Sequence, residues 1–161
     1  MQIDLVPTLI DMYRETFEGE VKPGWVWIVS GRPEESVLAG LATLTAAEAY
    51  AVPAPGRKSI AAHARHLQYT LELTLKRLHG ENPPADCQNS FQVAETSDEA
   101  WNTLQQGLRD AYSAVLAFFD LSRAKPVDEW PPIHVVGLAA MTAHNAYHLG
   151  AIRQLMLDGR R

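Results

Sequence analysis

Six histidines and a single cysteine are the residues of this chain best suited to chemistry at neutral pH. Imidazole is both the side chain that titrates near pH 7 and the commonest metal ligand in proteins. One cysteine excludes an intramolecular disulfide and any zinc site built from several thiolates. A metal site in this chain would therefore be rich in nitrogen. The histidines are His63, His66, His79, His134, His144 and His148.

The clearest spacing is that of His144 and His148, which stand four residues apart in an apolar segment. On a helix, this spacing places the two rings about 40° apart and one turn above each other, so that they can converge on one ion. Zinc, iron, nickel and copper all accept neutral imidazole. Two hydrogen-bonded core histidines are the alternative, but burying two imidazoles without a shared partner is costly, which favours a metal.

A metal ion needs at least one further ligand, and His63 and His66 offer it from an earlier segment. With Ile60 as the centre of that segment's apolar stripe, His63 lies about 60° and His66 about 120° from the centre. Helical periodicity therefore places His63 deeper in the molecule and does not select His66. His79 and His134 fall at a predicted helix end and helix start, and we expect neither to be a ligand.

Several motifs that would assign a reaction are absent. Between His144 and His148, Asn145 stands in place of the glutamate base of H-E-x-x-H zinc proteases. No glutamate precedes a histidine by three residues, as in di-iron carboxylate bundles. No glycine-rich phosphate loop and no G-x-S-x-G elbow is present. Cys87 lies in a polar segment, and we expect it to be a free thiol without a role in the chemistry.

Four long segments with helical periodicity would have to position these histidines. Ser59 is the expected N-cap of the second, and Thr96 and Glu99 have the spacing of a capping box for the third. The pattern predicts an all-α fold with a single domain over residues 1–161, a four-helix bundle with a long crossover between helices 1 and 2. The helices are expected from about Ile3 to Phe17, from Ile60 to Leu78 and from Thr96 to Phe119, and the fourth begins after Pro131 and Pro132 and continues to about Leu157.

The crossover runs from Gly19 to Lys58 and is rich in proline and glycine. Residues 34–44 within it could form a short helix. Residues 25–29 have the composition of a strand but no evident partner, so we expect an ordered loop that packs its indoles over the bundle. We expect Trp101, Phe118 and Phe119 to pack in the core. Trp25, Trp27 and Trp130 lie in connections between helices and could cover a pocket near the metal.

Composition narrows the function classes further. The 161 residues, 47% hydrophobic and 20% charged, suit one globular domain with a full core. A net charge of −5 does not favour binding of nucleic acid backbones. No targeting signal and no apolar run of about 20 residues is present, so we expect a cytoplasmic protein that does not span a membrane.

Two motifs resemble the DinB/YfiT-like family of metalloenzymes. Residues 59–67 match a helix with a His-Leu pair, and residues 144–154 match the pattern H-x-x-[YH]-H-x-G-Q-I-R. Helix order and spacing fit as well, so the resemblance covers nearly the whole chain. Ala151 stands where the family often has glutamine, so any polar contact made by that side chain is missing here.

The resemblance implies a three-histidine metal site formed by His66, His144 and His148. It prefers His66 to His63, because His66 is the one that precedes leucine. His63 then becomes a residue beside the site and our candidate for a catalytic base. The implied cofactor is a divalent transition metal: zinc, nickel, iron or manganese.

The resemblance also implies a function, because relatives include transferases and isomerases that use low-molecular-weight thiols. We therefore expect a metal-dependent transferase or hydrolase of a small molecule, with a thiol as a candidate cosubstrate. Two alternatives stay open: a non-catalytic, stress-associated metal-binding helical dimer, and a bundle without metal. A homodimer is expected, since bundles of this kind commonly dimerise through helix faces and a partner could cover apolar residues of the crossover.

Overall fold

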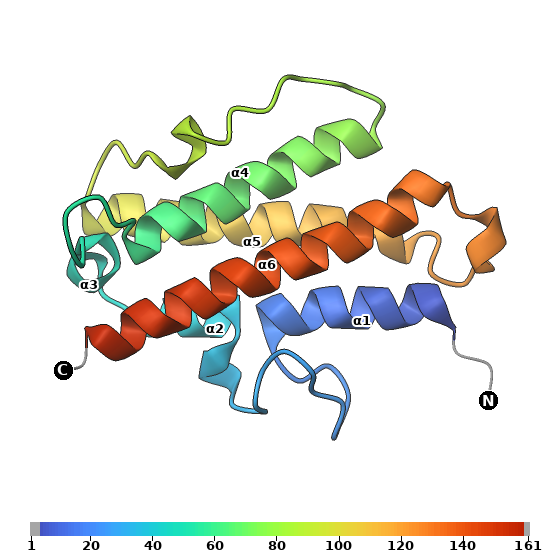
Figure 1. Ribbon diagram of the computed structural model, residues 1–161, viewed down its shortest axis with the longest axis horizontal. Coiled ribbons are helices and arrows are strands. Elements are labelled where there is room, and N and C mark those ends of the chain that lie inside the picture. Colours follow the sequence, from blue (N-terminus) through green and yellow to red (C-terminus); the bar gives the residue numbers. More distant parts are fainter. Residues whose placement is uncertain (1–3, 160–161) are drawn as a thin grey trace.

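A computed structural model of the chain describes residues 4–159, and its regular structure is helical (Figure 1). These residues contain no β-strand, which confirms the all-α prediction, and their four long helices correspond to the four predicted ones. Ile3, the expected start of the first helix, lies outside the described residues. The α-helices are α1 (Leu5–Glu18), α2 (Val37–Ala42), α3 (Ala46–Tyr50), α4 (Ile60–Leu78), α5 (Asp98–Asp120) and α6 (Pro132–Asp158).

The long helices pack as a bundle in which α6 lies between α1 and α4, with α5 behind them (Figure 1). The short helices α2 and α3 belong to the crossover between α1 and α4. The two helices that carry the four candidate histidines, α4 and α6, are therefore neighbours. None of the described helices is both long and apolar enough to cross a bilayer.

Aromatic side chains of α1 and α5 fill one part of the core. The rings of Phe17 and Tyr112 stack with centroids 4.5 Å apart. Trp101 and Phe119 are buried as predicted, and Phe118 is partly buried against the core. Trp130 is buried as well, stacked on Phe119 at 5.8 Å, so the expectation that it covers a metal pocket is wrong.

Side chains cap the two helices that follow long connections. Ser59 caps α4 as predicted, and its hydroxyl accepts a backbone N–H of the first turn. The capping box expected from Thr96 and Glu99 does not form. Ser97 caps α5 instead, accepting the N–H of Ala100 at 3.1 Å, so the cap lies one residue later than predicted.

The crossover contains more structure than the sequence analysis predicted. The helix expected over residues 34–44 is divided into a 3-10 turn at Pro33–Glu35 and helix α2, because Ser36 between them is extended. The short helix α3 was not predicted. Thr45 and Glu48 form a complete capping box at its start, which is the sequence signal that could have found it.

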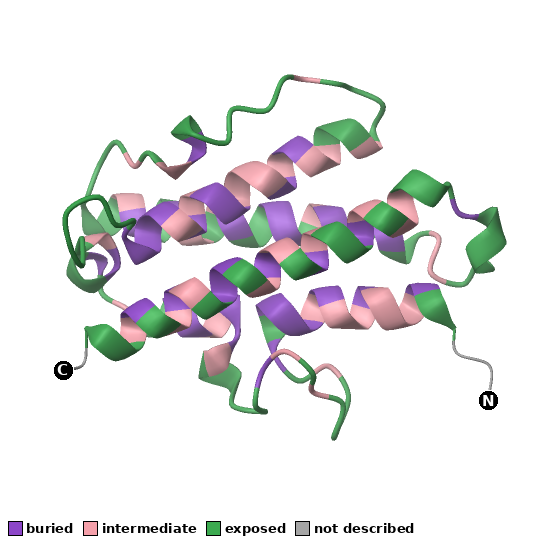
Figure 2. Ribbon diagram, in the orientation of Figure 1, coloured by how far each residue is buried: buried purple, intermediate pink, exposed green. Residues whose placement is uncertain are grey.

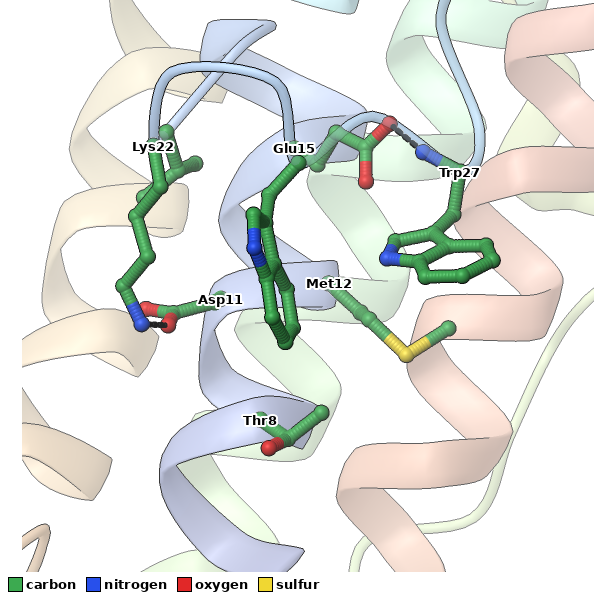
Figure 3. Close-up of a pocket in the computed structure, with 8 residues that line it drawn as sticks. Thr8, Asp11, Met12, Glu15, Lys22 and Trp27 are labelled. Atoms are coloured by element: carbon green, nitrogen blue, oxygen red, sulfur yellow. Dashed lines mark hydrogen bonds and ion pairs between the residues drawn. The ribbon is translucent and has the colours of Figure 1, made fainter. Parts of the chain in front are cut away.

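One buried carboxylate holds the loop after α1. The Oε1 atom of Glu15 accepts the backbone N–H groups of Trp27, Ile28 and Val29 at 2.7, 2.6 and 3.0 Å, and Figure 3 shows the bond from Trp27. These three donors would otherwise need a partner strand. The carboxylate therefore explains why this strand-like segment is an ordered loop, as predicted.

The indoles of this loop lie away from the histidines. Trp25 and Trp27 are 54% and 73% exposed and line a small hollow beside α1 with Thr8 and Met12 (Figure 3). The expectation that they cover a metal pocket is therefore wrong. The physical reason is the anchoring at Glu15, which ties the loop to α1 rather than to α4.

Candidate metal centre

Four histidine side chains meet between α4 and α6, and they include the three expected ligands. The Nε2 atom of His144 lies 3.1 Å from Nε2 of His66 and 3.1 Å from Nε2 of His148. Ligand atoms of these three residues all lie within 4.8 Å of one another. His66 and His148 are each only 4% exposed, whereas His144 is half-buried. The open side of the cluster is therefore the side of His144.

The separations of these nitrogens fit a shared ion. Two nitrogens bound at about 2.0–2.1 Å to one zinc ion lie about 3.0–3.4 Å apart for ligand angles of about 95–110°. Both 3.1 Å separations fall within this range. Two of the three nitrogen pairs are therefore already at the separation that a shared ion requires.

A chain of hydrogen bonds fixes the ring of His66. Its Nδ1 lies 2.6 Å from the Oγ of Ser90, and that hydroxyl donates to the carbonyl oxygen of Cys87, also at 2.6 Å. Because the hydroxyl's one proton is used there, Nδ1 of His66 must donate, which leaves a lone pair on Nε2. Phe91 stacks on the same ring, with centroids 4.0 Å apart. His66 is thus held in the tautomer and orientation that a metal ligand needs.

His63 lies on the other side of His148. Their Nδ1 atoms are 3.0 Å apart, so one of them donates to the other. His63 is less buried than His66, which is the reverse of the burial that helical periodicity predicted. No contact of His63 tests its expected role as a base, which stays a prediction.

Burial favours the neutral form of all four imidazoles. It lowers the pKa of His66 to about 4 and that of His148 to about 3, and the neighbouring histidines add to both shifts. Burial likewise lowers the pKa of His144 and of His63. The cluster therefore presents uncharged nitrogen donors at pH 7, which is the form that binds a cation.

A groove of about 240 Å³ between α4 and α6 borders the cluster at His144. Thr74 and Arg77 line it from α4, and Asn145 lines it from α6. The Nδ2 atom of Asn145 is buried and has no hydrogen-bond partner among residues 4–159. Cys87 also lines the groove and is a free, exposed cysteine, a position that the sequence did not indicate.

The two remaining histidines lie outside the cluster, as predicted. His79 caps the end of α4, and His134 lies in the first turn of α6. Both rings contact Phe118 edge-on, with centroids 5.7 and 5.6 Å away. Their contacts are therefore with the aromatic part of the bundle.

Ser90 and Phe91 complete the surroundings of His66 and were missed in the sequence. They lie on the 3-10 turn Asn89–Phe91 within the connection between α4 and α5. No local pattern marks them, because serine and phenylalanine in a connection are unremarkable by type or spacing. Their role depends on the path of the connection across α4.

A sequence model of the DinB superfamily matches residues 33–152 of this chain. The match extends from the crossover into α6 and includes all four clustered histidines. Comparison with curated proteins and with solved structures yields no significant match. The family match covers well over half of the chain, and the helical bundle agrees with it. The chain belongs to the DinB superfamily.

Proposed function

We propose that this chain is a metal-dependent enzyme acting on a small molecule, with a divalent transition ion held by His66, His144 and His148. The observation that carries the proposal is the convergence of three Nε2 atoms at separations of 3.1 Å around His144. Neutral imidazole donors suit zinc, nickel, iron or manganese. Three protein ligands leave at least one coordination position for substrate, which is typical of catalytic rather than structural zinc sites.

The donor set is compatible with the reaction class that the resemblance to the DinB/YfiT-like family implies. Such an ion would act as a Lewis acid and would lower the pKa of a nucleophile held beside it. Three uncharged ligands leave the ion's positive charge uncompensated, which favours an anionic nucleophile such as a thiolate. We therefore propose transfer of a group to a low-molecular-weight thiol, with hydrolysis of a small molecule as the related reaction.

The residues around the ligands have distinct tasks in this proposal. Ser90 and His63 hold the rings of His66 and His148 through their Nδ1 atoms. Because Nδ1 of His63 faces Nδ1 of His148, we propose that His63 takes part in the reaction through its other nitrogen, Nε2, as a base. Asn145 lines the groove beside His144, but its Nδ2 atom is buried and is not assigned a contact with substrate.

Metal analysis of protein purified without a histidine tag tests the ligand set. We expect about one equivalent of a transition metal in the wild type and loss of metal in His144→Ala and His148→Ala. His79→Ala and His134→Ala are matched controls, because these histidines lie outside the cluster, and they should retain the metal. Less than about a tenth of an equivalent in the wild type would refute the site.

A turnover assay separates the enzyme from the non-catalytic metal-binding dimer. The fully loaded protein is incubated with several low-molecular-weight thiols and a panel of electrophilic small molecules. Thiol consumption that His144→Ala abolishes would support the enzyme. A loaded protein that turns over none of these combinations would favour the non-catalytic alternative, even with the metal site intact.

A further inference from the structure

A second groove lies where α4, the start of α5 and the connection between them meet. Its volume is about 440 Å³, within the range of about 300–1,000 Å³ that is typical of small-molecule sites. Arg65 and Gln68 line it from α4, Glu99 lines it from α5, and residues 92–95 line it from the connection, which is exposed over most of its length (Figure 2). We call it the Arg65 groove. Among residues 4–159 it shares no lining residue with the groove at His144.

The guanidinium group of Arg65 has no partner within the described part of the chain. Its Nη1 atom is buried without a hydrogen bond, and the side chain takes part in no ion pair there. The Nε and Nη2 atoms also lack a partner but are not fully enclosed. These two nitrogens form the edge by which arginine binds a carboxylate through two parallel hydrogen bonds. Because a partly buried cation is costly without a counter-charge, the groove has a position for an anionic group.

Hydrogen-bond acceptors surround this single cation. The carboxylates of Glu95 and Glu99 line the groove, and neither forms an ion pair among residues 4–159. The amide nitrogen of Gln68 donates to Glu72 at 2.8 Å, so the carbonyl oxygen of Gln68 is available as an acceptor. An ammonium group has three donors and no acceptor. The Arg65 groove therefore has a position for an ammonium group as well as one for an anion.

The charges of the Arg65 groove discriminate between classes of ligand. Its lining residues carry one positive and two negative formal charges. The two glutamates would repel a phosphate or a dicarboxylate, and Arg65 would repel a ligand that is only a cation. A zwitterion carries both of the complementary charges. Val93, Ala100 and Leu104 also line the groove, so an apolar side chain of the ligand can be buried against them.

We propose that the Arg65 groove binds a zwitterionic amino compound, with its carboxylate at Arg65 and its ammonium group at Glu95 and Glu99. The ligand class is an α-amino acid or a dipeptide with an apolar side chain. The three-histidine cluster borders the other groove, so this binding requires no metal ion. The chain would therefore have a second ligand site that does not depend on the proposed reaction.

Isothermal titration calorimetry with L-leucine and glycyl-L-leucine tests the ligand class. We expect at least one of these two zwitterions to bind with a dissociation constant in the millimolar range or below. Leucinamide lacks the carboxylate and N-acetyl-L-leucine lacks the ammonium group, so each should bind at least about 10-fold more weakly than leucine, because charge-assisted hydrogen bonds are lost. A dissociation constant above about 10 mM for both zwitterions would overturn the proposal. Equal binding of leucine and either of its two derivatives would overturn it as well.

Substitutions in the groove test the two contacts separately. Arg65→Gln should weaken binding of the zwitterion at least about 10-fold, since the contact with the carboxylate loses its charge. Arg109→Gln, at an exposed arginine of α5 outside the groove, is the matched control and should bind like the wild type. Glu99→Gln should weaken binding of the zwitterion but not that of N-acetyl-L-leucine, which has no ammonium group. Wild-type affinity in Arg65→Gln would overturn the proposal.

Two further variants separate this site from the stability of the fold and from the metal centre. Arg65→Lys keeps the charge and most of the side chain but loses the planar fork, so it should melt at the wild-type temperature and still bind the zwitterion more weakly than the wild type. Wild-type affinity in Arg65→Lys would contradict the paired contact with a carboxylate. His144→Ala should bind the zwitterion like the wild type, because His144 borders the other groove. Loss of zwitterion binding in His144→Ala would contradict a separate site.

Discussion

Ser90→Ala is expected to weaken metal binding although Ser90 is not a proposed ligand. In the wild type, Nδ1 of His66 donates to Ser90, so Nε2 keeps its lone pair. Without the hydroxyl, the apoprotein can shift the proton to Nε2, where Nε2 of His144 lies 3.1 Å away as an acceptor. The metal-bound form cannot make this shift, because the lone pair on Nε2 is the ligand.

The cost of the substitution therefore falls mainly on the metal-bound form. A buried donor without a partner costs about 1–3 kcal/mol, which corresponds to about 5-fold to 150-fold in an equilibrium constant. Substitutions of residues that orient a metal ligand typically cost 10–100-fold in affinity. We expect the dissociation constant for zinc to rise by about 10–100-fold in Ser90→Ala.

Competition with a chromophoric chelator measures this dissociation constant, and the absorption spectrum of the cobalt form reports the ligand geometry. Ser90→Thr keeps the hydroxyl and should retain most of the affinity. Ser97→Ala is the matched control, since it removes the serine that caps α5 and should cost about 1 kcal/mol of stability without changing the affinity. A zinc affinity of Ser90→Ala within twofold of the wild type would refute the reasoning.

Further predictions concern the loop after α1 and the response to pH. Glu15→Ala removes the acceptor of three backbone N–H groups, so we expect the free energy of unfolding in urea to fall by at least about 3 kcal/mol, with metal content unchanged; a loss below about 1 kcal/mol would contradict this role. The pKa of His66 is about 4 and that of His148 is about 3 in the folded chain, whereas unfolded histidine has a pKa near 6.5. Below pH 6.5 the unfolded chain therefore binds more protons than the folded chain does. The free energy of unfolding of the apoprotein should therefore be fully present above pH 6.5 and decrease as the pH falls toward 4. His148→Ala should reduce this dependence, and an equal slope in wild type and variant would argue against the buried neutral histidine.

The long helices could be predicted because each carries its own local signals. Ser59 before α4 and the pair Pro131 and Pro132 at the start of α6 mark helix starts by chemistry that does not depend on the rest of the fold. The convergence of His144 and His148 could also be predicted, since their spacing on one helix fixes it. The helix after Thr45 was missed although its capping box is a local signal of the same kind.

The third ligand depends on packing between helices, which one sequence does not specify. The angular positions of His63 and His66 on the helix were counted from Ile60, whose side chain is buried in the core. The candidate site instead lies on the side of α4 that faces α6 and the connection after α4. The deeper position of His66 follows from how α4 lies against α6 and from the ring of Phe91 that covers it. Ser90 reaches His66 only through the path of that connection, 24 residues along the chain.

The distance in sequence between the facing histidines has a kinetic consequence. His66 and His144 are separated by 78 residues, so their nitrogens meet only after the chain has closed around α5. Contacts of this range form late in folding, because the entropy of closing the loop must be overcome first. An ion bound there should leave the refolding rate nearly unchanged and should slow unfolding instead. Chelation would therefore shorten the lifetime of the native state, most visibly as faster proteolysis under conditions where cleavage outpaces reclosing.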